Sequence, residues 1–250
     1  MNRLFSESKT VLDAFFNLVY PPVCQICRQH RATQPEGYVC SNCVHGANGV
    51  RFIVRPYCDR CGLPFEGELT AHFNCANCQG MRLYFRSARS AVVAKSLVLD
   101  VIHRYKYQGQ LWFEPFLRGL LEQATRAWLR IETWDMLIPV PLHPVKHRER
   151  GFNQAERLAE VFRGFSGIPL NRKALTRVKA TQTQTRLSQA DRMANVAEAF
   201  QCLPNHGAKE QKIILIDDVM TTGATTNACA RALIRAGAAE VCVWTVARGV

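Results

Sequence analysis

An unbroken apolar run near the C-terminus, Ile213 to Ile216, is the strongest hydrophobic pattern in the chain. Polar residues bound this run on both sides. Such a run, without alternation, is typical of a strand buried on both faces of a parallel sheet. Two adjacent carboxylates, Asp217 and Asp218, follow it directly. Because open α/β sheets bind ligands beyond the carboxyl ends of their strands, we expect both carboxylates to lie at a ligand site that water can reach.

Further apolar patterns predict that strands and helices alternate along the rest of the chain. Apolar runs mark the strands, and apolar residues at helical spacing mark the helices. This order indicates an α/β protein built on a parallel sheet. The other predicted strands span 87–95, 135–140, part of 168–176 and 240–247, and the predicted helices begin at Ser96, Pro115, Asn153 and near Thr225.

The loop after the acidic pair has the composition of a phosphate cradle. Thr221, Thr222 and Thr225 offer hydroxyl groups, while Gly223 and Ala224 leave the backbone N–H groups accessible to an anion. The helix that follows adds the positive end of its dipole. The two carboxylates suit a ribose diol, with a divalent ion nearby. One strand–loop–helix unit can therefore hold a 5-phosphorylated ribose.

The stretch IILIDDVMTTGAT resembles the signature of type I phosphoribosyltransferases, which bind phosphoribosyl pyrophosphate (PRPP). The chain contains neither the Gly-Lys-Ser/Thr of a Walker loop nor a GxGxxG motif. The resemblance implies that Asp217 and Asp218 hold the ribose and that Thr221–Thr225 hold the 5-phosphate. It also implies that Mg²⁺ bridges the pyrophosphate and the ribose hydroxyls.

A second basic segment, 143–151, lies between the strand over 135–140 and the helix that begins at Asn153. We interpret it as a loop that supplies a pyrophosphate site, because guanidinium groups bind phosphate oxygens in pairs and keep their charge. Arg148 and Arg150 would balance the charge that develops during catalysis. A solvated basic loop is the alternative.

Eight of the eleven cysteines form four CxxC pairs. The spacings C-x2-C-x12-C-x2-C and C-x2-C-x13-C-x2-C are typical of four-cysteine zinc sites, in which two knuckles present four thiolates to one ion. We therefore predict about two structural zinc ions. Pairing of consecutive knuckles is the simplest arrangement, and cross-braced pairing is the alternative. The predicted ligands are Cys24, Cys27, Cys40, Cys43, Cys58, Cys61, Cys75 and Cys78.

Residues 1–20 carry the pattern of an amphipathic helix, with Leu12, Phe15, Phe16 and Val19 on one face. The apolar run is shorter than the ~20 residues that a membrane span needs. We expect this helix to dock on the body of a protein that is not an integral membrane protein. Association with a membrane surface is the alternative. Metal-binding rather than disulfide-bonded cysteines favour a cytoplasmic location.

The chain is basic, with a formal net charge of +12, which favours polyanionic partners. The stretch 143–192 holds eleven Lys and Arg against four Asp and Glu. The polar segment 177–195, which overlaps the end of this stretch, is interpreted as a hood that closes over the site. A track for single-stranded nucleic acid and a solvated loop are the alternatives.

The whole chain resembles the ComF family, which includes GntX-like DNA-utilisation proteins. The resemblance rests on the Cys-rich N-terminus, PVPLHPVKHRERGFNQAERLA and IILIDDVMTTGAT. It implies a type I phosphoribosyltransferase fold with an N-terminal four-cysteine zinc-ribbon region. The expected parts are the helix over 1–20, a double zinc-ribbon region over 21–80 and a phosphoribosyltransferase-like domain over 81–250.

The family resemblance also implies a PRPP-binding protein linked to DNA uptake in competence, or to the use of extracellular DNA, with a DNA-import or helicase protein as partner. If the protein is an enzyme, it displaces pyrophosphate from PRPP with an acceptor nucleophile. The alternative is a non-catalytic module that binds PRPP or single-stranded DNA and assists DNA import.

Overall fold

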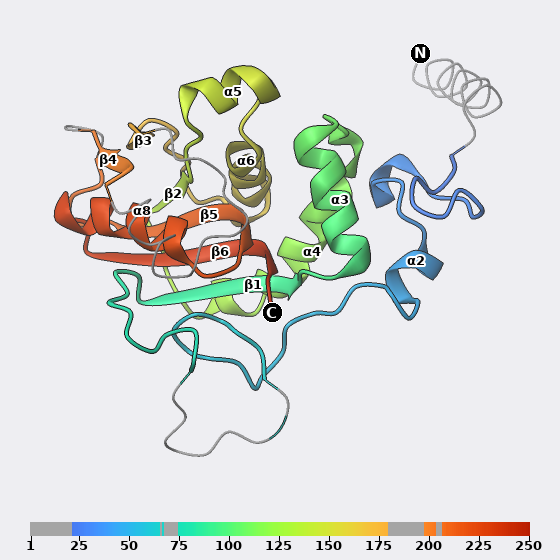
Figure 1. The fold of residues 1–250 in the computed structure, drawn as a ribbon, viewed down its shortest axis with the longest axis horizontal. Helices are drawn as coiled ribbons and strands as arrows, with labels where there is room; N and C mark the ends of the chain where they lie inside the picture. Colours follow the sequence, from blue (N-terminus) through green and yellow to red (C-terminus); the bar gives the residue numbers. More distant parts are fainter. Residues whose placement is uncertain (1–21, 66, 68–74, 180–197, 204–206) are drawn as a thin grey trace, which may run out of the picture.

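A four-stranded parallel sheet forms the centre of the protein, with strand order β1-β6-β5-β2 (Figure 1). The computed structural model describes residues 22–65, 67, 75–179, 198–203 and 207–250. The predicted helix over 1–20 and most of the 177–195 segment lie outside these residues. The strands are β1 (Ser87–Val93), β2 (Met136–Pro139), β5 (Lys212–Met220) and β6 (Glu240–Arg248).

Strand β5 is buried on both faces, as its unbroken apolar run predicts. Successive side chains of a strand point to opposite faces. Ile214 and Ile216 pack into the hydrophobic cluster on one side of the sheet, and Ile213 and Leu215 pack into the cluster on the other. All four side chains are fully buried. A strand that lies between two cores has no solvent-facing positions, so its sequence shows no alternation.

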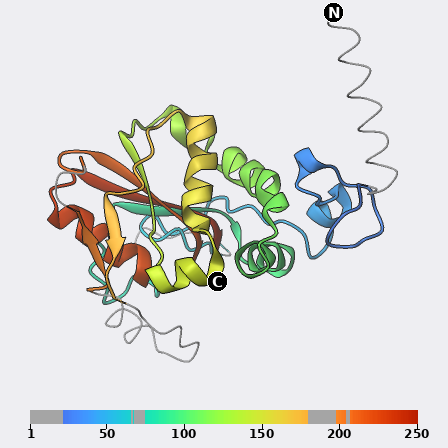
Figure 2. The ribbon, with the colours of Figure 1, turned by 90° about the horizontal axis from the view of Figure 1, so that it is seen from above.

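Helices on both faces bury these strands (Figures 1 and 2). Apolar residues of α3, α4 and α6 fill the first cluster, whereas α8 packs in the second beside a two-stranded antiparallel sheet. Among the described residues, no helix is long and apolar enough to cross a membrane. The bounds are α3 (Ser96–Tyr107), α4 (Glu114–Thr125), α5 (Pro144–Arg150), α6 (Gln154–Ser166), α8 (Ala224–Arg235), β3 (Leu175–Arg177) and β4 (Phe200–Cys202).

The predicted fold class is confirmed: an α/β protein on a parallel sheet, with two four-cysteine clusters towards its N-terminus. Two local predictions were wrong. The basic segment after β2 is not a loop, because α5 occupies it, with His143 as N-cap and Gly151 as left-handed C-cap. The central strand does not end at the apolar run, because β5 continues through Asp217 and Asp218 to Met220. Pairing with β6 extends that far.

The two cysteine-rich segments pack at different places on the body (Figure 1). The first contains α2 (Ser41–His45) and contacts α3, where Arg104 Nη1 donates to the carbonyl of Gln25 at 2.8 Å. The second lies along β1, whose Ala88 N–H donates to the carbonyl of Arg60 at 2.7 Å. The connecting stretch also bonds to β1, through Ile53 N and Ala91 O at 3.0 Å. These contacts cover an edge strand that would otherwise expose unpaired backbone groups.

Candidate functional site

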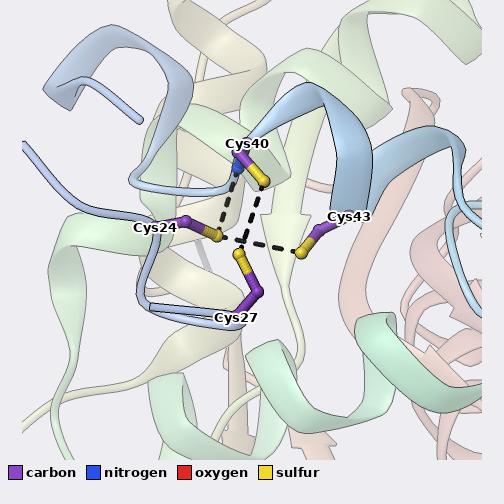
Figure 3. Close-up of side chains that lie close together, drawn as sticks. All are labelled: Cys24, Cys27, Cys40 and Cys43. Carbon is purple, nitrogen blue, oxygen red and sulfur yellow. Dashed lines mark hydrogen bonds between the residues drawn. The ribbon is translucent and has the colours of Figure 1, made fainter. Parts of the chain in front are cut away.

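The first cysteine cluster has the dimensions of a tetrahedral metal site (Figure 3). The sulfur atoms of Cys24 and Cys43 lie 3.9 Å apart, and those of Cys27 and Cys40 lie 3.8 Å apart. All four sulfurs lie within 4.8 Å of one another. In a regular tetrahedron with Zn–S bonds of ~2.3 Å, neighbouring sulfurs lie ~3.8 Å apart. The four side chains point at a common centre that fits one zinc ion.

The second cluster repeats this geometry. The Cys58 and Cys78 sulfurs lie 3.8 Å apart, and the Cys61 and Cys75 sulfurs lie 3.6 Å apart. Each cluster thus joins consecutive knuckles, as the simplest pairing predicts, and the cross-braced alternative is wrong. Four protein sulfurs leave no open coordination position, so both centres are suited to structural rather than catalytic zinc.

The thiols of the first cluster differ in acidity. Hydrogen bonds from the backbone at Gln29, together with His30, lower the pKa of Cys27 to about 5. Burial raises the pKa of Cys40 and Cys43 above the ordinary thiol value. A bound cation removes this difference, because a metal ion stabilises every thiolate that coordinates it. The cluster therefore suits zinc, and four thiolates are stable there only when a cation is bound.

The two carboxylates that sequence reasoning placed within reach of water are buried, which corrects that expectation. Asp217 is 8% exposed and Asp218 is 4% exposed. Part of their bonding is local, since Asp217 Oδ1 accepts from the Asp218 N–H at 2.9 Å and Asp218 Oδ1 accepts from the Val219 N–H at 2.7 Å. Charged side chains from elements that are distant in the sequence also surround these two carboxylates.

Cations surround the acidic pair. Lys106 Nζ, at the end of α3, forms an ion pair with Asp218 Oδ2 at 2.5 Å. Burial lowers the pKa of Lys106 to about 8, although the charge of Asp217 opposes this shift. Burial raises the pKa of Asp217 to about 6, and the charges of Lys106, Arg177 and Arg150 oppose it. Helix α3, helix α5 and strand β3 thus each place a cation near the end of β5.

The loop from Thr221 to Thr225, predicted to be a phosphate cradle, turns at a left-handed glycine and leads into α8. Gly223 is the N-cap of α8 and adopts a left-handed φ of +82°. A Cβ at this position would lie 2.7 Å from the terminal carbon of Met220. Thr222 Oγ1 accepts from the Ala224 N–H at 3.4 Å, and Thr226 Oγ1 donates to the Gly223 carbonyl at 3.1 Å. The loop therefore presents backbone at the start of a helix, beside the acidic pair.

The structure separates the two arginines that were predicted to act together. Arg150 lies near enough to Asp217 to influence the pKa of that carboxyl. Its guanidinium also lies over the ring of Tyr107, 5.0 Å from the ring centroid. Arg148 is exposed on α5, and no contact joins it to the acidic pair among the described residues. The residues around Arg150 line a cleft of 290 Å³, namely Lys106, Tyr107, Gly109, Lys146, Glu149 and Arg150.

Sequence reasoning missed three basic residues of this region: Lys106, Arg177 and Arg248. Lys106 belongs to HRYKYQGQ, whose mixture of bases and aromatics was visible but gave no indication of its carboxylate partner. Arg177 stood within the segment interpreted as a hood. Arg248 had no local signal, because it closes an ordinary apolar strand. Its contacts depend on loops that only the fold brings together.

The N-terminal part of the chain matches a known domain family. The family model of the double zinc ribbon domain matches residues 15–79. This range contains both four-cysteine clusters.

Relatives with known names match nearly the whole chain. "Competence protein F" from Haemophilus influenzae is 31% identical over 90% of this chain and 96% of its own length. "DNA utilization protein YhgH" from Escherichia coli O157:H7 is 33% identical over 92% of this chain and 99% of its own length. "Competence protein ComFC" from Bacillus subtilis is 28% identical over 86% of each chain. Among solved structures, a glutamine PRPP amidotransferase from B. subtilis, complexed with ADP and GMP, matches 51% of this chain and 24% of its own chain, with 22% identity and a TM-score of 0.34.

We predict that the purified protein contains about two zinc ions per chain, one in each cluster. Replacing Cys24 or Cys58 by Ser should each remove about one ion, because three thiolates hold zinc less tightly than four. Replacing Cys202 by Ser is the control and should leave the zinc content unchanged, because Cys202 lies outside both clusters. Metal analysis of the four proteins measures this directly, and a wild-type content well below one ion would contradict it.

We also predict that Asp217→Asn stabilises the fold at pH 8, by on the order of 2 kcal/mol. Burial raises the pKa of Asp217 from 3.8 to about 6, so the folded protein bears the cost of a buried charge above pH 6. As the pH falls towards 4, the folded carboxyl becomes protonated and the advantage of the variant should disappear. The Asn side chain can still accept the Asp218 N–H bond.

Denaturant unfolding at pH 8 and pH 4 measures this difference. Asp135→Asn is the control, because Asp135 is exposed and accepts the Lys212 N–H at the opposite end of β5. The control variant should show no gain in stability at pH 8. A destabilised Asp217→Asn at pH 8 would contradict the expected cost of the buried carboxylate.

Proposed function

The chain belongs to the ComF family, and from that premise we propose that it binds PRPP with Mg²⁺ at the carboxyl edge of its sheet. One observation carries this proposal. The acidic pair lies near the end of β5, and a glycine-capped loop that opens α8 follows that strand. A ribose 5-phosphate needs acceptors for its hydroxyls and donors for its phosphate, and this unit offers both within a few residues.

Each part of the site has a proposed role. Asp217 and Asp218 accept hydrogen bonds from the ribose hydroxyls, and Thr221–Thr225 bind the 5-phosphate. Arg150 binds the pyrophosphate, and Arg148 contributes to the charge around it from the exposed side of α5. Lys106 compensates the charge of the acidic pair in the free protein, through its 2.5 Å ion pair with Asp218.

The reaction that this site would support is displacement of pyrophosphate from C1 of PRPP by an acceptor nucleophile. Bound Mg²⁺ supplies positive charge to the leaving pyrophosphate and to the ribose oxygens. Arg150 adds a fixed guanidinium, whose charge does not depend on pH in the ordinary range. The nearly buried setting of Asp217 and Asp218 strengthens each electrostatic contact, because the effective dielectric is lower there than in water.

We place this activity in the use of external DNA. The names of the relatives refer to competence and to DNA utilization. A DNA-import or helicase protein would then be the partner of this chain. We propose the cytoplasm as the location, because eight cysteines arranged for metal need a reducing compartment.

A second candidate function is binding of single-stranded DNA without catalysis, and one observation favours it. Tyr107 is 64% exposed at the cleft beside α5, with Arg150 over its ring and His103 at 4.9 Å between ring centroids. Exposed aromatic rings beside basic groups are what single-stranded nucleic acids use for stacking and phosphate contacts. The formal charge of +12 supports the same interpretation.

For the first proposal, we expect Asp217→Asn combined with Asp218→Asn to weaken binding of Mg²⁺·PRPP by roughly ten- to a thousandfold, because two charged acceptors become neutral. Gly223→Val should weaken binding by another route, since its Cβ would meet Met220 and its side chain would cover the cradle. Asp135→Asn, at the far end of β5, is the matched control. Calorimetry on the four proteins decides, and equal affinities would exclude PRPP from this site.

For the second proposal, we expect binding of a single-stranded oligonucleotide to weaken steeply as salt rises, because phosphate contacts release counterions. Tyr107→Ala should weaken it by roughly 5- to 100-fold if one base stacks on the ring. Trp112→Ala is the matched control, since Trp112 is an exposed aromatic that does not line the cleft. Fluorescence anisotropy at several salt concentrations measures both effects. Binding that does not respond to salt would contradict the proposal.

A further inference from the structure

One buried guanidinium contacts both the second cysteine cluster and the loop at residues 221–226, which we call the phosphate loop. Arg248, at the end of β6, is 1% exposed. Its Nε donates to the Cys61 carbonyl at 3.3 Å, and its Nη2 lies 3.9 Å from the Cys61 sulfur. Its Nη1 donates to the carbonyls of Met220 at 3.1 Å, Gly249 at 2.6 Å and Thr221. The Arg248 side chain therefore joins Cys61 of the second cluster to Thr221 of the loop.

The charge of Arg248 points to a metal in this cluster. A buried charge is costly unless an opposite charge compensates it. Among the described residues, no carboxylate forms an ion pair with Arg248; its contacts are carbonyl oxygens and one sulfur. Four thiolates around one Zn²⁺ carry a net charge of −2, and the ligand Cys61 contacts the guanidinium. The zinc-loaded cluster is thus the counter-charge that this arginine lacks otherwise.

A second connection joins the same two regions. Asn227, in the first turns of α8, accepts the Tyr84 N–H through Oδ1 at 2.8 Å and donates through Nδ2 to the Arg82 carbonyl at 3.0 Å. Residues 82–84 follow the last knuckle of the second cluster. Close backbone packing fixes the first knuckle, because a Cβ on Gly62 would lie 2.6 Å from the Ala88 carbonyl oxygen. The cluster is therefore held against both the loop and its helix.

The bonds to Arg248 also orient the loop. In a trans peptide, the C=O and the following N–H point in opposite directions. Because the carbonyls of Met220 and Thr221 point at Arg248, the N–H groups of Thr221 and Thr222 point away from it. Backbone donors on that side are what a phosphate needs.

The first cluster lacks these connections. Its segment contacts α3 through Arg104 and Gln25, and Gly37 lies against the backbone of Phe116 in α4. Cys24 and Cys40 form a small hydrophobic cluster of their own with Ala32, whereas three cysteines of the second cluster belong to the large one that contains Met220 and Ala224. Among the described residues, no hydrogen bond joins the first segment to residues 220–226.

We propose that the second zinc centre orients the phosphate loop, and that Arg248 is the positioning residue that connects the two. Zinc in this cluster holds Arg248, and Arg248 holds the carbonyls of the loop so that its N–H groups face the ligand. The first zinc centre stabilises only its own segment. The affinity part of this inference rests on the proposed function, whereas the mechanical coupling does not.

The coupling is tested by amide hydrogen exchange of residues 221–226, without any ligand. Arg248→Lys keeps the charge but cannot bridge several carbonyls, so exchange in this segment should accelerate by about tenfold or more. Arg248→Met should have a larger effect. Arg104→Lys is the matched control, because it breaks the corresponding bond of the first segment, and it should leave exchange in 221–226 within about twofold of wild type.

The role of the metal is tested by removing one ligand from each cluster. Cys78→Ser and Cys27→Ser should each lose about one zinc ion by metal analysis. Only Cys78→Ser should accelerate exchange in 221–226, by about tenfold or more. Circular dichroism identifies any variant that has unfolded globally, and for such a variant Arg248→Lys supplies the decisive comparison. Equal exchange in 221–226 for Arg248→Lys and Arg104→Lys overturns the proposal.

Calorimetry with Mg²⁺·PRPP separates this inference from the proposed function. A wild-type protein that does not bind PRPP excludes the proposed function, while the exchange experiment still decides the coupling. If wild type binds PRPP, Arg248→Lys should weaken binding by about tenfold and Arg104→Lys should not. A merely structural role would lower the unfolding temperature of both variants alike and would leave their PRPP affinities equal, which would also overturn the proposal.

Discussion

Burial of two carboxylates at the end of the central strand constrains the surrounding structure. Asp217 and Asp218 lie on β5 between two hydrophobic clusters, where a charge without a partner would be unstable. Lys106 meets this requirement from α3, and Arg150 and Arg177 contribute from α5 and β3. Elements that are far apart in the sequence thus converge on one strand end. In the proposed function, these same cations are the ones that an anionic substrate would contact.

The N-terminal region is stabilised in a different way, because its two cysteine-rich segments are too small to form large cores. In the first segment, the cysteines themselves make up most of the small buried cluster. In the second, three of the cysteines join the large hydrophobic cluster that also contains Met220 and Ala224. Metal ligation can stabilise short chains that bury little apolar area. The first segment packs on the hydrophobic cluster that contains α3 and α4, and the second packs on the cluster that contains Met220 and Ala224.

Much of the fold could be predicted from local patterns. Helix α3 begins at Ser96 and α6 follows directly on Asn153, as the sequence pattern predicts. The errors arose where a local pattern met a tertiary contact. The acidic pair was expected in contact with water, but pairing with β6 extends β5 past it, and Lys106 covers it. Arg148 and Arg150 look equivalent in the sequence, yet only Arg150 approaches Asp217.

The sequence by itself determined the buried central strand, the acidic pair with its threonine and glycine loop, and the four cysteine knuckles. Each of these is encoded within about twenty consecutive residues, where periodicity and ligand spacing act directly. Only the tertiary structure decided the strand order β1-β6-β5-β2 and the partners of the buried charges. Lys106 and Asp218, or Arg248 and Cys61, are more than a hundred residues apart. Their contacts depend on how the helices and zinc ribbons pack against one sheet. No local sequence pattern contains that information.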